Sequence, residues 1–174
     1  MLLKNVGRIV NDNYVSLSGE AWGNGVISKI YVATLFGLLP LVFGAIIGLW
    51  SPLWADFVGP LISVVGVLTG FSINAIVLLT SHSSDRSYEI KTKVVDQTKD
   101  YTLYSILVGI ITLVALIIGY ILANGDLPLV LDLGISTMTI VSIIVYILVF
   151  HYFLMLFVIV HRLYSLVHGN ALNN

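Results

Sequence analysis

The stretch SHSSDRSYEIKTKVVDQTKD, residues 81–100, separates two long apolar segments and carries half of the basic residues of the chain. Its basic side chains are Arg86, Lys91, Lys93 and Lys99. The remaining ones lie before the first apolar segment and at the end of the last: Lys4, Arg8, Lys29 and Arg162. Cytoplasmic loops of membrane proteins carry the excess of Lys and Arg. This distribution therefore predicts that residues 81–101 and both termini are cytoplasmic.

The composition requires a lipid environment. The chain has 174 residues, of which 58% are hydrophobic and 10% charged, and its mean hydropathy is +1.01. Such a chain cannot hide its apolar surface in one soluble core. Four stretches have the roughly 20 residues that a helix needs to cross a hydrocarbon core about 30 Å thick. They are Ile30–Trp50, Pro60–Thr80, Leu103–Ala123 and Ser136–Val160.

Runs of this length fit helices rather than the alternating strands of a barrel. We therefore predict an all-α membrane protein, a four-helix transmembrane bundle with both termini in the cytoplasm. Its parts are a cytoplasmic arm (1–29), the bundle (30–162) with a cytoplasmic loop (81–101), and a tail (163–174). The expected location is the bacterial inner membrane. Only two short links, 51–59 and 124–134, remain outside, so we expect no external receptor domain.

Several segments next to the spans also have interpretable patterns. Leu3, Val6 and Val10 recur at helical spacing, so the arm is expected to begin with an amphipathic helix on the inner membrane surface. The charged run before Tyr101 contains no Gly or Pro and is expected to continue the third helix inward, capped by Ser84 or Asp85. The fourth helix is expected to continue inward past Arg162. Trp50 and Trp54 suit an aromatic belt at the outer interface.

Small residues recur at helical spacing in the first two spans. GAIIG (44–48) and GVLTG (66–70) are both G-x-x-x-G segments, and such faces let helices approach closely in lipid. The third span has a weaker version in Ser105, Gly109, Thr112 and Gly119. Packing could occur within the chain, with the first two spans as an antiparallel hairpin, or between subunits. The residues expected to pack helices are Gly37, Gly44, Gly48, Gly66 and Gly70.

Two polar side chains are expected to be buried in the spans. His151 lies eleven residues before Arg162, about 16 Å along a helix axis, and it could sense protons, line a cavity or simply bond a neighbouring helix. Asn74 is expected to form an interhelical hydrogen bond, with a polar constriction of a channel as the alternative.

The sequence lacks the patterns of several function classes. It has no Cys, and no Asp or Glu lies in any predicted span. Paired carboxylates, a metal-ligand cluster and a Gly-rich phosphate loop are absent, so we expect no enzymatic activity and no metal site. Haem is not expected, because the other histidines, at 82, 161 and 168, do not match the depth of His151. We expect no cofactor, and the net charge of −1 gives no direct attraction to nucleic acid.

The layout resembles that of the membrane subunits of bacterial Kiwa anti-phage systems. The resemblance covers the span order, the G-x-x-x-G faces and the run GFSINAIVLLTS, from Gly70 to Ser81. It implies a homo-oligomeric inner-membrane sensor, a tetramer being one candidate, that engages a cytoplasmic DNA-binding effector. Small fluoride channels are less similar because their charge bias is weak, and small drug exporters carry a carboxylate in the first span that this chain lacks.

Two hypotheses for function follow. The first is a non-enzymatic sensor or scaffold that docks a soluble cytoplasmic protein through Arg86, Lys91, Lys93 and Lys99, with lipid and further copies of itself as its other partners. The alternative is a small oligomeric ion channel lined by His151 and Asn74.

Overall fold

The computed structural model describes residues 7, 9–11, 26–82, 89–124 and 136–168, and nearly all of these residues are helical. Four helices are long and apolar enough to cross a membrane, over Ile30–Trp50, Ala55–Ser81, Val95–Asn124 and Thr137–Tyr164. The predicted fold class is confirmed: the chain is an all-α four-helix bundle of the membrane type.

The first span consists of three helical segments, and each of the other spans is a single helix. In chain order the segments of the first span are α2 (Val26–Ala33), the π-helix η1 (Thr34–Leu38) and α3 (Leu39–Trp50). They are followed by α4 (Ala55–His82), α5 (Glu89–Asn124) and α6 (Thr137–His168).

Two helices extend beyond their spans, as the sequence predicts. α5 begins at Glu89, and α6 ends at His168, beyond Arg162. The residues expected to cap α5, Ser84 or Asp85, lie outside the described part of the chain. Of the N-terminal arm, the described residues 7 and 9–11 are helical.

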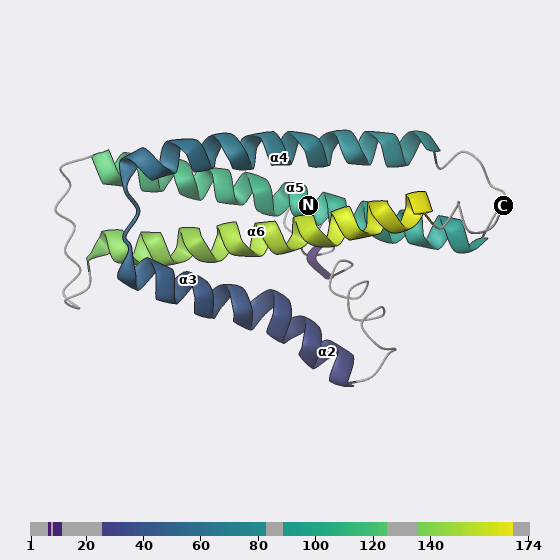
Figure 1. The fold of residues 1–174 in the computed structure, drawn as a ribbon, viewed down its shortest axis with the longest axis horizontal. Coiled ribbons are helices and arrows are strands. Elements are labelled where there is room, and N and C mark those ends of the chain that lie inside the picture. Colours follow the sequence, from purple (N-terminus) through teal and green to yellow (C-terminus); the bar gives the residue numbers. More distant parts are fainter. Residues whose placement is uncertain (1–6, 8, 12–25, 83–88, 125–135, 169–174) are drawn as a thin grey trace.

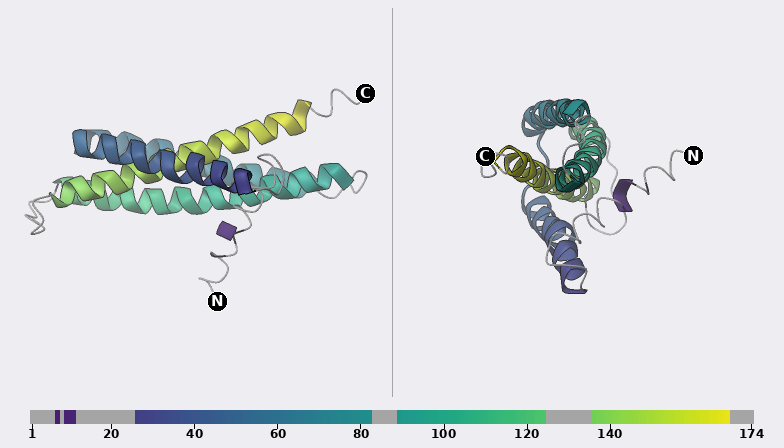
Figure 2. Two further views of the ribbon diagram at one scale, coloured as in Figure 1. Left: turned by 90° about the horizontal axis from the view of Figure 1, so that it is seen from below. Right: turned by 90° about the vertical axis from the view of Figure 1, so that its right-hand side faces the viewer.

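The helices pack in the order α4, α5, α6, α3. α5 contacts α4 on one side and α6 on the other, while α3 contacts α6 alone among the long helices described. The end-on view in Figure 2 shows α4, α5 and α6 grouped together and the first span attached outside this group. The expected hairpin between the first two spans is therefore wrong for the isolated chain, because α6 occupies the packing face of α3.

The core lies among α4, α5 and α6. It contains fully buried apolar side chains from each of these helices: Val58 and Val65, Tyr101 and Leu116, and Val145, Tyr152, Met155 and Ile159. Large apolar side chains such as Val67 and Phe157 are instead exposed on the outside of the bundle. An exposed apolar surface of this extent is typical of a protein that contacts lipid.

The link between α3 and α4 is fixed to α6. The backbone N–H of Leu53, which is buried, donates to the hydroxyl of Ser142 at 2.9 Å, and that hydroxyl donates to the carbonyl of Met138 at 2.6 Å. On either side of Leu53, Trp50 and Trp54 are 88% and 68% exposed. Their exposure at one end of the bundle is the arrangement that an interfacial aromatic pair requires.

Candidate functional site

The first span changes helix type where its sequence contains a proline. Pro40 has no N–H, so it cannot donate to the carbonyl four residues earlier, that of Phe36. Thr34–Leu38 form a π-helix at this point, and the N–H of Leu39 donates to the carbonyl of Thr34, five residues back. Wider turns of this kind are often found at functional sites because they redirect backbone carbonyls.

His151 supplies a donor for the carbonyl of Phe36. Its Nδ1 lies 2.8 Å from that oxygen, and its Nε2 lies 2.9 Å from the hydroxyl of Tyr104 on α5. The Tyr104 and His151 rings meet edge to face with their centroids 5.8 Å apart. One imidazole therefore joins the first span, α5 and α6.

The partners of His151 determine which nitrogen carries the proton. A carbonyl oxygen can only accept, so Nδ1–H must be the donor to Phe36. In the neutral imidazole, Nε2 then accepts from the hydroxyl of Tyr104. Both ring nitrogens have partners, and this arrangement satisfies a polar ring within apolar surroundings. The expectation that His151 is buried and bonds neighbouring helices agrees with these contacts, although its side chain is partly rather than fully buried.

The two hydrogen bonds of His151, to Phe36 and to Tyr104, form what we call the histidine bridge. This bridge lies where the first span leaves the bundle. Figure 1 shows α3 alongside α6 and α2 diverging from it. α2 makes no close backbone approach to the other long helices described. The hydrogen bond to Phe36 joins η1 to α6 next to the point where α2 diverges, so a movement of η1 away from α6 would break it. The site is suited to coupling helix position to the state of a hydrogen bond.

A second polar contact was not found by sequence reasoning. The hydroxyls of Tyr152 on α6 and Thr69 on α4 are 3.0 Å apart, and both side chains are buried. Thr69 donates to the carbonyl of Val65 at 2.7 Å, so Tyr152 donates to Thr69. The signal in the sequence was the pair of hydroxyl residues Thr69 and Ser72, three residues apart in the second span. It was missed because Ser and Thr often bond their own helix.

The predicted glycines differ in their surroundings. Gly44 and Gly48 are buried against α6, and a Cβ at these positions would lie 2.6 Å from the backbone nitrogen of Ile147 and 2.7 Å from that of Ile143. A Cβ at Gly37, Gly66 or Gly70 would meet nothing within 4 Å. α3 and α6 thus approach backbone to backbone, whereas the glycine face of α4 is open in the isolated chain.

Asn74 is exposed on the outside of the bundle, so the expectation of a buried amide does not hold within one chain. The reason is its position on α4. Ser72 is buried, and Asn74 lies two residues later, about 200° around the helix. Asn74 and His151 therefore do not face a common cavity within one chain.

Of the predicted docking residues, Lys99 has a described side chain. It lies on α5, partly buried, with its Nζ 3.4 Å from a carboxylate oxygen of Asp96. Lys91 and Lys93 lie on the same helix, but their side chains are outside the described part of the structure, as is the whole of Arg86.

The chain matches no family model, no curated protein and no solved structure.

Proposed function

We propose that this chain is a non-enzymatic sensor or scaffold of the bacterial inner membrane that engages a soluble protein in the cytoplasm. The observation that carries the proposal is the distribution of Lys and Arg along the sequence: they lie before the first span, between the second and third spans, and at the end of the fourth. Four crossings would put all of these positions on one side of the membrane. This leaves two short links for the other side. All substantial soluble surface then faces the cytoplasm, and so do the contacts with soluble partners.

The inward extension of the helices supports this proposal. Between Glu89 and Val94, α5 adds six residues, about 9 Å of helix, before the candidate span begins at Val95. α6 passes close by, and the guanidinium carbon of Arg162 lies 5.9 Å from the centre of the Tyr101 ring. Lys91 and Lys93 belong to this extension of α5, and Lys99 follows six residues after Lys93 on the same helix.

The resemblance to Kiwa membrane subunits suggests which stimulus and which soluble partner this protein has. We propose a homo-oligomer that responds to phage attack and recruits a DNA-binding effector. A stimulus must reach the chain through the membrane, because little of it lies outside. It can act as a signal only if it favours one helix arrangement over another. The first span is the element best placed to move, since its inner half diverges from α6 while His151 bonds its π-helix.

The test is co-purification of the chain with the soluble proteins encoded next to its gene. The variant changes Arg86, Lys91, Lys93 and Lys99 to Glu, and we expect it to lose the partner while still forming the bundle. A matched control replaces the acids of the same segment, Asp85, Glu89, Asp96 and Asp100, with amides. Equal recovery of the partner by the wild type and the charge-reversed variant would remove the support for this docking surface.

An oligomeric ion channel is the second candidate, and the exposure of Asn74 favours it. An amide facing lipid has no hydrogen-bond partner there, so it gains from facing another chain or water. In that arrangement the pore would lie among several copies. Ion flux into liposomes tests this candidate directly. Flux that is lost in Asn74→Leu and unchanged in His151→Leu would place the pore along α4 and argue against the sensor proposal.

A further inference from the structure

A groove of about 730 Å³ lies on α6 between α3 and α4. It exists because α3 packs against α6 and α4 packs against α5, while α3 and α4 do not pack against each other. Its volume is within the range of about 300–1,000 Å³ that is usual for sites of small ligands. Because its walls belong to three of the four candidate spans, the groove opens sideways into the membrane rather than into water.

The inner part of the groove is apolar. Ile47 of α3, Leu61 of α4, and Val149 and Phe153 of α6 line it. It follows α6 over the eight residues from Tyr146 to Phe153, about 10 Å of helix. An elongated apolar space at this depth is filled by hydrocarbon, because the surrounding medium is made of lipid chains.

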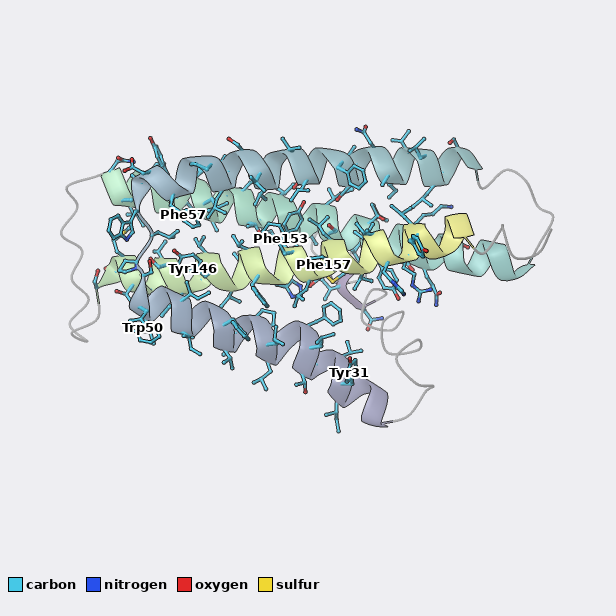
Figure 3. All side chains as sticks on the ribbon, in the orientation of Figure 1. Tyr31, Trp50, Phe57, Tyr146, Phe153 and Phe157 are labelled. Carbon is cyan, nitrogen blue, oxygen red and sulfur yellow. The ribbon has the colours of Figure 1, made fainter. Side chains whose placement is uncertain are left out.

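The outer end of the groove is polar. Ser51, Asp56 and the hydroxyl-bearing Tyr146 line it together with Trp54, and Asp56 is exposed. Figure 3 shows Tyr146 and Phe57 close to this end of the bundle, near Trp50. A groove with an apolar interior and a polar end at the interface matches the two parts of a phospholipid.

The charge at this end distinguishes between headgroups. Asp56 is negative, and the sequence contains no Lys or Arg from Ile30 to Asp85 or from Asp100 to His161. An anionic headgroup would therefore meet a carboxylate without a compensating cation. An ammonium group offers three N–H donors and a positive charge to the same carboxylate.

We propose that this groove binds one phospholipid with an amine-bearing headgroup, its acyl chain between Ile47 and Leu61 and its ammonium group at Asp56. The occupant of choice is phosphatidylethanolamine in the leaflet opposite the basic loop. The lipid separates α3 from α4 and fills the space that an antiparallel hairpin of the first two spans would otherwise close. This site depends on the spans crossing a membrane and not on the sensor role, so its test is independent of any cytoplasmic partner.

Native mass spectrometry of the full chain tests the site. Palmitoyl-oleoyl phosphatidylethanolamine and the corresponding phosphatidylglycerol are added together in equal amounts. The wild type is expected to retain the ethanolamine lipid about threefold over the glycerol lipid, the order of effect of an exposed ion pair. Asp56→Asn is expected to bind both lipids equally. An unchanged preference in Asp56→Asn would overturn the headgroup assignment.

A second pair of variants tests the acyl-chain site. Leu61→Trp fills the groove and is expected to reduce retention of both lipids. Val67→Trp adds the same side chain on the exposed face of α4, where Val67 is 73% exposed, and is expected to retain them. Circular dichroism establishes that both variants are folded. Equal retention by the two folded variants would show that the bound lipids lie elsewhere.

A competing occupant is a second copy of the chain. The protein has no native cysteine, so Phe57→Cys places a single thiol beside the groove. With lipid in the groove, this thiol is expected to remain unpaired between chains under oxidation. Rapid formation of a disulfide-linked dimer at this position, in bilayers rich in phosphatidylethanolamine, would assign the groove to a subunit interface and overturn the lipid proposal.

Discussion

The segments GAIIG in α3 and GVLTG in α4 have the same glycine spacing and opposite surroundings. Gly44 and Gly48 allow α3 to approach the backbone of α6, and both are buried. Gly66 and Gly70 face open space within the chain. A G-x-x-x-G segment therefore marks a helix face that permits close approach, but it identifies neither the partner helix nor whether that partner belongs to the same chain.

The difference arises from how the helices are arranged. α5 contacts α4 through a face that includes Thr69 and Ser72, and the glycine face of α4 lies beside it rather than on it. On α3 the glycines are the packing face itself, reinforced by the stacked rings of Phe43 and Phe150, whose centroids are 5.3 Å apart. The closed face stabilises the monomer, and the open face is available to another molecule.

The largest effect is expected from closing the space between α3 and α6. A Leu at Gly44 or Gly48 would meet the backbone of Ile147 or Ile143, which cannot move aside as a side-chain tip can. Overpacking of this kind costs about 1–3 kcal/mol, so we expect each variant to unfold at a lower fraction of SDS in mixed micelles. Gly66→Leu is the matched control and is expected to unfold like the wild type. Equal destabilisation by Gly48→Leu and Gly66→Leu would contradict the contrast between the two segments.

The helices and their approximate bounds could be predicted from the sequence, because uninterrupted apolar runs of this length in lipid have few alternatives to a helix. The extensions of α5 and α6 beyond their apolar spans could also be predicted, since no Gly or Pro ends either helix there. The pairing of the helices could not. Lipid chains are as apolar as leucine, so the hydrophobic pattern does not show which side of a span faces protein.

The candidate site was predicted in part. His151 was selected by its depth, but its partners depend on Pro40 and the π-helix, which bring the carbonyl of Phe36 toward α6. Pro40 was a visible signal, since it lies inside a span. Asn74 is predicted to be buried, and within a single chain it is exposed. Asn74 follows Gly66 and Gly70 at intervals of four residues, and the sequence does not determine whether that face of α4 points into the bundle.

The next largest effect concerns the N-terminal half of the first span, which lies before Gly44 and Gly48 and is not held by their contact with α6. His151→Leu removes the donor to the carbonyl of Phe36 and the partner of Tyr104. Interhelical hydrogen bonds in membranes are worth about 0.6–2 kcal/mol, so we expect a smaller loss of stability than in Gly48→Leu.

The same variant should also loosen α2. Spin labels at Tyr31 and Phe157, which are both exposed and are labelled in Figure 3, report the distance between α2 and α6. We expect a broader distance distribution in His151→Leu than in the wild type. An unchanged distribution would mean that the histidine bridge does not hold this half of the span.

A smaller effect is expected from Tyr104→Phe, which retains the ring packing on His151 and removes one hydroxyl. The bond from Nδ1–H to Phe36 remains, so α2 should keep its position. The loss of one such bond averages about 0.6 kcal/mol. SDS titration measures the loss and the same spin labels measure the position. A distance distribution as broad as that of His151→Leu would show that the tyrosine, and not the histidine alone, positions the first span.

The smallest effect on folding, and the one that best defines the open segment, is expected from Gly66→Leu combined with Gly70→Leu. A Cβ at either position meets nothing within 4 Å, so monomer stability should remain within error of the wild type. If the face is occupied by a second copy, the larger side chains should prevent its close approach and shift the assembly toward monomers. Light scattering in detergent and cross-linking in bilayers measure that shift.

Asn74→Leu on the same face should act in the same direction, because it removes the amide that a neighbouring chain could bond. Unchanged assembly in both variants would place the subunit contact on another helix and leave the α4 face to lipid.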